Sequence, residues 1–303
     1  MVKDKYIGAS AIIFAAILWG FDGVVLTPRL FNLDVGFVVF MLHFVPFVLM
    51  NFVLFKEYRH LKEFTFQDII IFALIALFGG ALGTLAIVKA LFLVHFQHLS
   101  IVVLLQKLQP IFAISLSAIF LKEKIGKNFY FWAIIAIISS YFLTFGLHSP
   151  HFSKNPNLIK AAIWAVIAAF SFGSATVLGK KALMKFSFFT TNFYRFALTS
   201  LIMFIYVLIT NKFSEFQHIT PLNWFLFFLI AFTTGSGAIF LYYFGLNKVK
   251  AIVSTICELL FPISAVFFDY IINHKSLTSI QIVSALIMII AVIEISYRKP
   301  AIR

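Results

Sequence analysis

Hydrophobic residues occur along this chain in long runs separated by short polar connectors. A helix needs about 20 apolar residues to cross the hydrocarbon core of a bilayer. Ten stretches approach that length, and the connectors between them leave no room for a soluble domain. We therefore predict an all-α polytopic membrane protein with ten transmembrane helices. The expected spans are residues 7–27, 36–55, 68–92, 100–121, 129–147, 159–180, 189–210, 222–246, 251–272 and 278–297.

The composition agrees with this pattern. Of 303 residues, 62% are hydrophobic and 12% are charged, whereas soluble domains have about 45–50% apolar and about 25% charged residues. The mean hydropathy is +1.02. The only cysteine, Cys257, excludes an internal disulfide and is expected to be a small packing residue.

The net charge of +13 is distributed unevenly between the connectors. With the N-terminus inside, 16 of the 24 Lys and Arg residues fall in inner segments and five in outer segments. Cytoplasmic loops of membrane proteins carry such an excess of Lys and Arg. We therefore expect both termini in the cytoplasm, and no surplus of charge that would require a nucleic-acid partner.

The chain also repeats itself at a shift of 152 positions. The matched pairs are Pro110 and Pro262, Gln106 and Glu258, Gly83 and Gly235, His43 and Arg195 and, after one gap, Trp19-Gly20 and Phe172-Gly173. Because each half (residues 1–150 and 151–303) would contain five spans, the second half would begin on the opposite side of the membrane. Secondary transporters use such inverted repeats to alternate access to a site near the midplane.

Three segments together resemble the drug/metabolite transporter superfamily, and within it the ten-helix EamA type. They are "ILWGFDG" in the first span, "LQPIFAISLSAIFLKEKI" with Glu123 at the end of the fourth, and "NFYRFALTSLI" in the seventh. The resemblance covers nearly the whole chain and implies a transporter of the bacterial plasma (inner) membrane, with amino acids, related metabolites or small cations as substrates. Two positions depart from the family pattern: His43 replaces the usual Arg of the first half, and Lys275 stands in place of a Glu in the second.

An ionisable side chain inside a membrane span is costly and is a functional candidate by default. The spans contain Asp22, His43, Lys89, Lys107, Arg195, Glu258 and Asp269. Lys89 and Asp269 lie near the outer helix ends, where side chains can reach the interface. Asp22, His43 and Lys107 lie at a similar depth. They could pair with one another, or form the outer half of a polar cavity that binds a charged substrate group or takes up a proton.

Arg195 and Glu258 lie about two turns from the inner face and are expected to pair across the repeat. Glu258 precedes Pro262 by the same four residues that separate Gln106 from Pro110, which places each polar group on the same face as its proline. Proline removes a backbone hydrogen bond and can break a helix. We expect helix kinks at both prolines and choose Glu258 first as a substrate-binding or proton-coupling carboxylate, with Asp22 and His43 as further coupling candidates.

Aromatic side chains could line a pocket or bind a cationic headgroup. Trp19, Tyr194, Tyr242 and Tyr243 are the candidates, although packed or lipid-facing rings are the favoured explanation for each in so aromatic a chain. Gly79, Gly80, Gly83, Gly235 and Gly237 are expected to allow close helix approach.

Other motifs carry no chemistry. "GSATVLGKK" at residues 173–181 has the wrong spacing for a phosphate-binding loop and lies in a membrane span. His95 with His98, and His148 with His151, lack a nearby carboxylate and are expected to be surface residues rather than metal ligands. We expect no enzyme activity, no cofactor and no metal.

The sequence thus predicts a secondary carrier, working as a monomer or homodimer, that moves a small polar metabolite by alternating access. The mixture of charges suits an amino acid or related zwitterion, and the family resemblance favours export. Uptake of a quaternary amine such as choline is an alternative, with an aromatic box around Glu258. A lipid flippase or a non-transporting membrane partner is another, and a polar cavity enclosed by the first, fourth, seventh and ninth spans would count against both.

Overall fold

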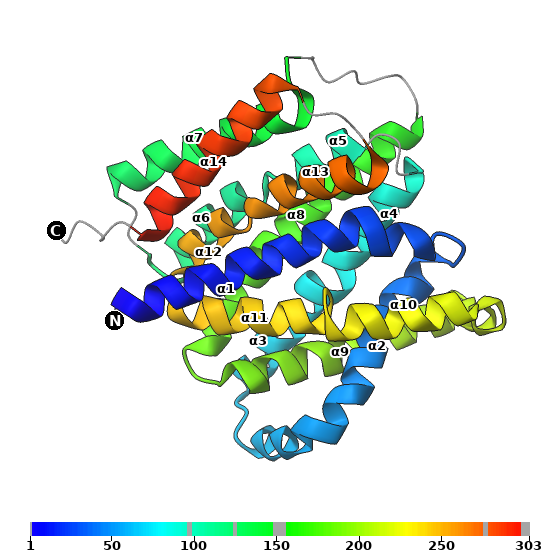
Figure 1. Ribbon diagram of the computed structural model, residues 1–303. Coiled ribbons are helices and arrows are strands. Elements are labelled where there is room, and N and C mark those ends of the chain that lie inside the picture. The colour runs from blue at the N-terminus through cyan, green and yellow to red at the C-terminus, as the bar shows by residue number, and fades with distance from the viewer. Residues whose placement is uncertain (1, 96–98, 124–125, 148–155, 275–277, 298–303) are drawn as a thin grey trace.

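The computed structural model describes residues 2–95, 99–123, 126–147, 156–274 and 278–297 (Figure 1). All secondary structure in these residues is helical, which confirms the expected class. Eight helical segments are long and apolar enough to cross a membrane. The expected spans 100–121 and 278–297 contain shorter apolar helices, Gln109–Phe120 and Ser279–Ile295.

The helices of the first half follow one another with short connections. They are α1 (Val2–Phe21), η1 (Asp22–Leu26), η2 (Thr27–Leu30), α2 (Val35–Leu54), η3 (Phe55–Lys62), α3 (Phe66–Ile75), η4 (Ala76–Leu82), α4 (Gly83–Leu93), α5 (Leu99–Gln106), α6 (Gln109–Phe120) and α7 (Lys127–Phe145). The second half repeats the pattern with fewer irregular segments. It contains α8 (Pro156–Leu183), α9 (Phe188–Ile209), η5 (Lys212–His218), α10 (Pro221–Phe232), α11 (Ser236–Lys248), α12 (Ala251–Cys257), α13 (Leu260–Asn273) and α14 (Ser279–Tyr297).

Two helices are interrupted at matching places of the two halves. The fourth span breaks between α5 and α6, and the ninth breaks between α12 and α13. Pro110 and Pro262 each stand within the first three residues of the second piece. Proline cannot donate a backbone hydrogen bond, and interrupted backbone at membrane depth is tolerated where it is buried in protein or lines a cavity.

Two other segments are π-helices. η1 continues α1 beyond Phe21, and η4 joins α3 to α4. In a π-helix each backbone bond reaches five residues back, so carbonyl groups at its ends are left for other donors, and such segments are frequent at functional sites.

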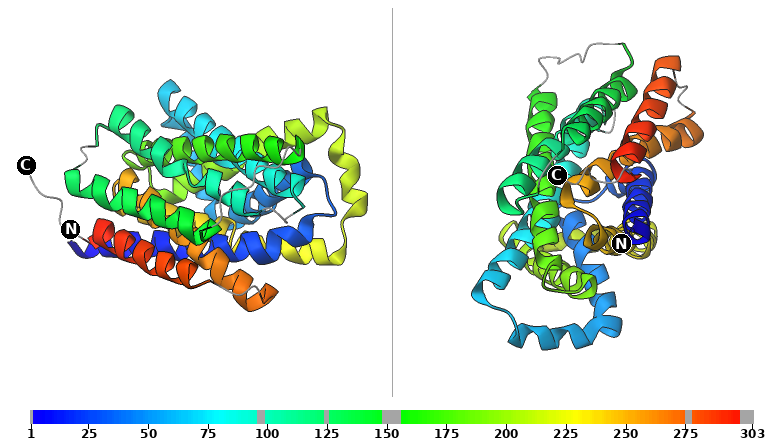
Figure 2. Two further views of the ribbon diagram at one scale, coloured as in Figure 1. Left: turned by 90° about the horizontal axis from the view of Figure 1, so that it is seen from above. Right: turned by 90° about the vertical axis from the view of Figure 1, so that its left-hand side faces the viewer.

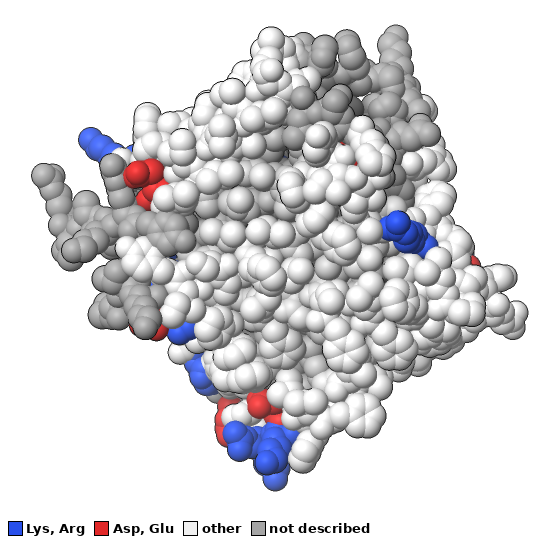
Figure 3. Space-filling model, viewed as in Figure 1, with Lys and Arg blue, Asp and Glu red and all other residues white. Residues whose placement is uncertain are grey.

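The helices form one bundle in which α1 begins and α14 ends at the same end (Figures 1 and 2). We call this the terminal end and the other the distal end. α7 and α14 lie side by side, and the Gln281 amide at the start of α14 donates to the Leu143 carbonyl near the end of α7 at 3.1 Å. Across the middle of the face in Figure 3, the surface is almost free of charge, as a lipid-facing surface requires.

Candidate functional site

A cavity of about 460 Å³ lies between the two halves and is lined by both broken helices. Small-molecule sites in proteins typically enclose about 300–1,000 Å³. Its lining reaches Thr144 at the end of α7, Asp269 near the end of α13 and Gln281 at the start of α14. These three residues mark the distal end of the bundle, so the cavity approaches the surface there.

The terminal end is closed by contacts between the halves. Glu123, just beyond α6, accepts hydrogen bonds from the backbone N–H groups of Ala251 and Ile252 at 3.0 and 3.2 Å. A carboxylate at a helix N-terminus satisfies otherwise unpaired donors and is favoured by the helix dipole. Glu123 therefore fastens the first half to the start of α12.

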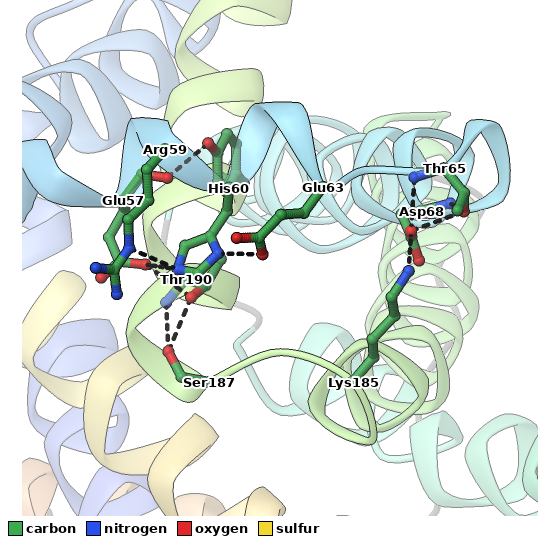
Figure 4. A network of polar contacts seen from close by, with 10 residues as sticks. Glu57, Arg59, His60, Glu63, Thr65, Asp68, Lys185, Ser187 and Thr190 are labelled. Atoms are coloured by element: carbon green, nitrogen blue, oxygen red, sulfur yellow. Dashed lines mark hydrogen bonds and ion pairs between the residues drawn. The ribbon is translucent and has the colours of Figure 1, made fainter.

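A polar network at the same end joins η3 and α3 to the turn between α8 and α9 (Figure 4). The Thr190 hydroxyl donates to Glu57 at 2.7 Å, and His60 lies 3.6 Å from the same carboxylate. Lys185 forms an ion pair with Asp68. The network adds to the closure of the terminal end.

Glu258 lies at the break between α12 and α13 and accepts hydrogen bonds from three helices. Tyr242 donates to one carboxylate oxygen at 2.9 Å, with Ser254 at 3.4 Å from the same atom. The Gln109 amide donates to the other oxygen at 2.6 Å. Tyr242 also shares a 2.7 Å hydrogen bond with Thr176 of α8. The carboxylate is thus fixed from α6, α11 and α12 at the floor of the cavity.

Lys107 lies at the matching break between α5 and α6. It is 8% exposed, and its ammonium group lies 3.9 Å from the centre of the Phe261 ring, a cation–π contact. Each break therefore contacts the other half, since Gln109 reaches Glu258 while Lys107 reaches Phe261.

Arg195 does not pair with Glu258, so that expectation is wrong. Its guanidinium donates to the Gly79 carbonyl at 2.7 Å and to the Tyr243 hydroxyl at 3.2 Å. Gly79 belongs to the π-helix η4, whose free carbonyls take the place of a carboxylate. A Cβ on Gly79 would lie 3.2 Å from the guanidinium carbon, so only glycine permits this approach without displacement.

Asp22, His43 and Lys107 also do not pair with one another. Asp22 accepts hydrogen bonds from Thr27 at 2.9 Å and from Thr234 at 3.0 Å. The Nδ1 atom of His43 lies 2.9 Å from the Val39 carbonyl, one turn earlier in α2. All three ionisable groups nevertheless line the same cavity.

Most of the residues singled out from the sequence come together in this cavity. Its lining includes Trp19, Asp22, His43, Gln106, Lys107, Arg195, Tyr242, Glu258 and Pro262. Trp19 and Tyr242 are in ring contact, with centroids 5.4 Å apart. Asp269 also lines the cavity, although it was expected to serve only the helix end, whereas Lys89 lies over the Trp164 ring at 4.6 Å.

Tyr194 is not among the lining residues. Its hydroxyl donates to the Glu57 carbonyl at 2.9 Å, and its ring packs against Phe64 with centroids 4.6 Å apart. Adjacent residues of a helix point about 100° apart, so Tyr194 faces away when its neighbour Arg195 faces the cavity.

Several lining residues carry no signal strong enough to find them in the sequence. Gln109 could have been noticed, because it follows Gln106 by three residues and therefore shares its helix face. The hydroxyls of Thr176 and Thr234 have no such signal, since threonine in a membrane helix commonly bonds its own backbone. Phe261 is one of 41 phenylalanines.

The glycines fall into two groups. A Cβ on Gly79, Gly80 or Gly83 would lie less than 3.0 Å from an atom of α8 or α9, in agreement with close helix approach. A Cβ on Gly235 or Gly237 would instead meet the carbonyl oxygen of the residue five earlier, at 2.8 and 2.4 Å. These two glycines serve the break between α10 and α11.

The remaining motifs form no site in the described residues. "GSATVLGKK" lies within the continuous helix α8, without the loop that phosphate binding requires. His98, His148, His151 and Lys275 lie outside the described residues.

Comparison with known proteins extends these observations. The sequence pattern of the EamA-like transporter family matches residues 6–145 and 159–297, one match in each half. The chain is 53% identical over 295 residues to the riboflavin transporter ImpX of Fusobacterium nucleatum subsp. nucleatum, covering 97% of this chain and 99% of that protein. A crystal structure of a protein that is 14% identical covers 94% of this chain and 95% of that chain with a TM-score of 0.68, a likeness of fold.

Proposed function

The chain belongs to the EamA-like transporter family, and we propose that it carries riboflavin or a closely related flavin across the membrane by alternating access. Membership makes it a membrane transporter of a small metabolite and not an enzyme. The observation that carries the flavin proposal is the 53% identity, over almost the whole length, to a protein named a riboflavin transporter.

The chemistry of the cavity suits this substrate. Riboflavin has a flat aromatic ring system, a polar edge with carbonyl and N–H groups, and a chain of hydroxyls. The cavity offers the rings of Trp19, Phe172, Tyr242 and Phe261 beside hydrogen-bonding groups such as Gln106. Apolar and aromatic walls with a few convergent polar groups are typical of sites for ligands of this kind.

Contacts between matched helices support inverted repeats. Lys180 in the last turn of α8 donates to the Leu246 carbonyl at 2.8 Å, and nearby Lys248 lies 3.4 Å from Asp4 in the first turn of α1. α8 therefore ends where α1 begins, so the first helices of the two halves run in opposite directions. Ten spans in two inverted sets of five, residues 1–150 and 151–303, account for this arrangement.

The starts of the third and eighth spans support the same symmetry. Thr65 and Asp68 form a capping box at the start of α3, as Thr220 and Asn223 do at the start of α10. Asp68 pairs with Lys185 in the connection between α8 and α9. Asn223 forms two hydrogen bonds with Asn32 in the connection between α1 and α2. Each capping box thus contacts the opposite half.

The distribution of Lys and Arg supports a terminal end that lies in the cytoplasm of a bacterial cell. On that assignment the cavity faces outward in this structure, and the contacts of Glu123 close the cytoplasmic side. Rocking of the halves about the broken helices would open the cytoplasmic side.

An amino-acid substrate is the second candidate, favoured by the oppositely charged Lys107 and Glu258 at the two breaks. A choline-like cation has less support, because Gln109, Tyr242 and Ser254 already occupy the Glu258 carboxylate. Residues of α1, α5, α6, α9 and α13 line the cavity, together with Glu258 at the break of the ninth span, which counts against a lipid flippase and a non-transporting partner.

Binding to the purified protein tests the choice. Flavin fluorescence is quenched when the ring stacks on aromatic side chains, so we expect saturable quenching that amino acids and choline do not reverse. Trp19→Ala should weaken riboflavin binding about tenfold, as the loss of one stacking partner does. Trp224→Ala, on α10 outside the cavity and 40% exposed, is the matched control. Absence of quenching, together with stabilisation by an amino acid, would replace the flavin proposal with the second candidate.

A further inference from the structure

Asp22 is a carboxylate that lines the cavity and is held by neutral donors alone. It is partly exposed to the cavity and accepts hydrogen bonds from two threonine hydroxyls. None of the described Lys, Arg or His side chains forms an ion pair with it. An ionised carboxylate held without a cation at membrane depth is costly, and binding a proton removes that charge.

The two hydroxyls suit both protonation states. A threonine hydroxyl can donate to a carboxylate or accept from a protonated carboxyl group. Thr27 and Thr234 can therefore keep their contacts with Asp22 when it gains a proton. Glu258 is held differently, because one of its carboxylate oxygens accepts from the Gln109 amide at 2.6 Å, and an amide nitrogen can donate but cannot accept.

His43 is less suited to carry a proton. Its Nδ1 atom lies against the Val39 carbonyl, which requires a hydrogen on that nitrogen. A second proton would turn the buried ring into a cation at membrane depth, in a cavity that Arg195 also lines. Asp22 is therefore the strongest of the three coupling candidates.

Asp22 also connects segments that alternating access would move. It lies in the π-helix η1 of the first half, and Thr234 lies in the break between α10 and α11 of the second. Hydrogen bonds to an ionised group are about twice as strong as neutral ones. Proton binding at Asp22 would thus weaken a contact between the halves. Ala175 occupies the equivalent position of the second half, so the repeat has a carboxylate at this position in the first half alone.

The elements packed against η1 bring few other charges. η2 contributes Arg29, whose guanidinium donates to the Val25 carbonyl, and α13 contributes Asp269 and Tyr270. α10 has no titratable residue, and those of α1 (Lys3, Asp4, Lys5 and Tyr6) are confined to its far end. Asp269 lies nearer the mouth of the cavity and is the carboxylate to separate from Asp22 experimentally.

We propose that Asp22 is a proton-binding site through which a proton gradient drives substrate movement. This rests on the proposed transport function but names its energy source. Asp22→Asn imitates the protonated side chain and should uncouple transport from the gradient.

The experiment uses the full-length protein in liposomes and two assays of riboflavin. Counterflow, the exchange of external labelled for internal unlabelled riboflavin, requires no net proton movement, whereas accumulation under an acid-outside gradient does. We expect the wild type to do both and a protonophore to abolish accumulation. Asp22→Asn should lose accumulation while counterflow persists, if more slowly. Glu63→Gln, at an exposed carboxylate outside the cavity, should still accumulate riboflavin.

The outcomes separate the two proposals. Absence of counterflow in the wild type would refute riboflavin transport. Counterflow without any effect of the gradient, or gradient-driven accumulation by Asp22→Asn, would overturn the proton site. An infrared titration needs no substrate: the band of a protonated carboxyl group that appears on acidification should be lost in Asp22→Asn and kept in Asp269→Asn. If the band is unchanged in Asp22→Asn, the inference fails whatever the substrate is.

Discussion

Among the single residues of the cavity, Glu258 depends on a donor from the other half of the chain. The Gln109 amide lies 2.6 Å from the Glu258 carboxylate. Gln106 is the counterpart of Glu258 in the repeat, and its side chain forms no hydrogen bond with a described residue. The cross-repeat contact is therefore made by the residue three positions after the symmetric one.

This contact gives a prediction for stability. Gln109→Ala removes a hydrogen bond to a charged group, and we expect it to lower the free energy of unfolding by about 1–3 kcal/mol. Thermal unfolding of the detergent-purified protein, followed by tryptophan fluorescence, measures the change. Gln106→Ala is the matched control and should leave the midpoint nearly unchanged. Equal effects of the two substitutions would show that the contact contributes little.

The charged residues of the cavity were easier to predict from the sequence than the neutral residues that form hydrogen bonds with them. Glu258, Lys107 and Asp22 stand out because ionisable groups are rare in apolar runs. Neutral polar residues do not, because Ser115, Thr144 and Thr176 all bond carbonyls of their own helices, and only Thr176 of these three also reaches across to Tyr242. The choice between these states depends on tertiary packing, which the local pattern does not contain.

At the scale of elements, the π-helix η4 determines where Arg195 lies. Arg195 and Thr199 lie one turn apart in α9. Arg195 donates to the Gly79 carbonyl and Thr199 donates to the Ala76 carbonyl, and both carbonyls belong to η4. The apolar run that contains Gly79 and Gly80 is typical of an ordinary α-helix, in which the backbone carbonyls are already paired. A charged partner was therefore predicted for Arg195. A π-helical turn contains one more residue than an α-helical turn and leaves carbonyl groups free. Whether such a turn forms in η4 depends on how α8 and α9 pack against it.

The fit around Gly79 is testable by adding one methyl group. In Gly79→Ala the new Cβ would lie 2.9 Å from the Ala175 Cβ and would displace the guanidinium, so we expect a loss of about 1–3 kcal/mol in stability. Gly23→Ala, in the other π-helix, would place its Cβ 3.9 Å from the nearest atoms and should be tolerated. A midpoint for Gly79→Ala at or above that of the wild type would contradict the close packing described.

The broken helices were more accessible to prediction than the π-helices. Proline lacks the backbone N–H that a helix requires. Pro110 and Pro262 therefore located both interruptions within a few residues. The lengths of most spans followed from the apolar runs, because the bilayer sets them. Residues 251–272, for example, were expected as the ninth span and form Ala251–Ile272.

At the scale of the whole molecule, the proposed alternating access requires the contacts that close the terminal end to break when the cavity changes sides. Glu123 contributes two hydrogen bonds at the start of α12. Removing a capping side chain costs about 0.5–2 kcal/mol. Glu123→Ala should therefore raise the population open at the terminal end by about 2- to 30-fold.

The single cysteine provides a reporter for this change. Cys257 precedes the break in the ninth span and is 0% exposed. We expect Glu123→Ala to accelerate its alkylation by a membrane-permeant maleimide. Glu63→Ala, which removes another carboxylate at the terminal end, should not. Similar rates in the wild type and Glu123→Ala would indicate that this contact does not hold the terminal end closed.

The most direct test of the proposed transport is counterflow of labelled riboflavin into liposomes. It compares the wild type with a variant in which a large side chain fills the cavity. Thr84 lines the cavity from α4, so Thr84→Trp should block the site, whereas Ile138→Trp on α7, at a position 51% exposed, should not. If riboflavin moves through this cavity, the wild type and Ile138→Trp exchange riboflavin and Thr84→Trp does not. No exchange by the wild type, or undiminished exchange through the filled cavity, would contradict the proposed transport.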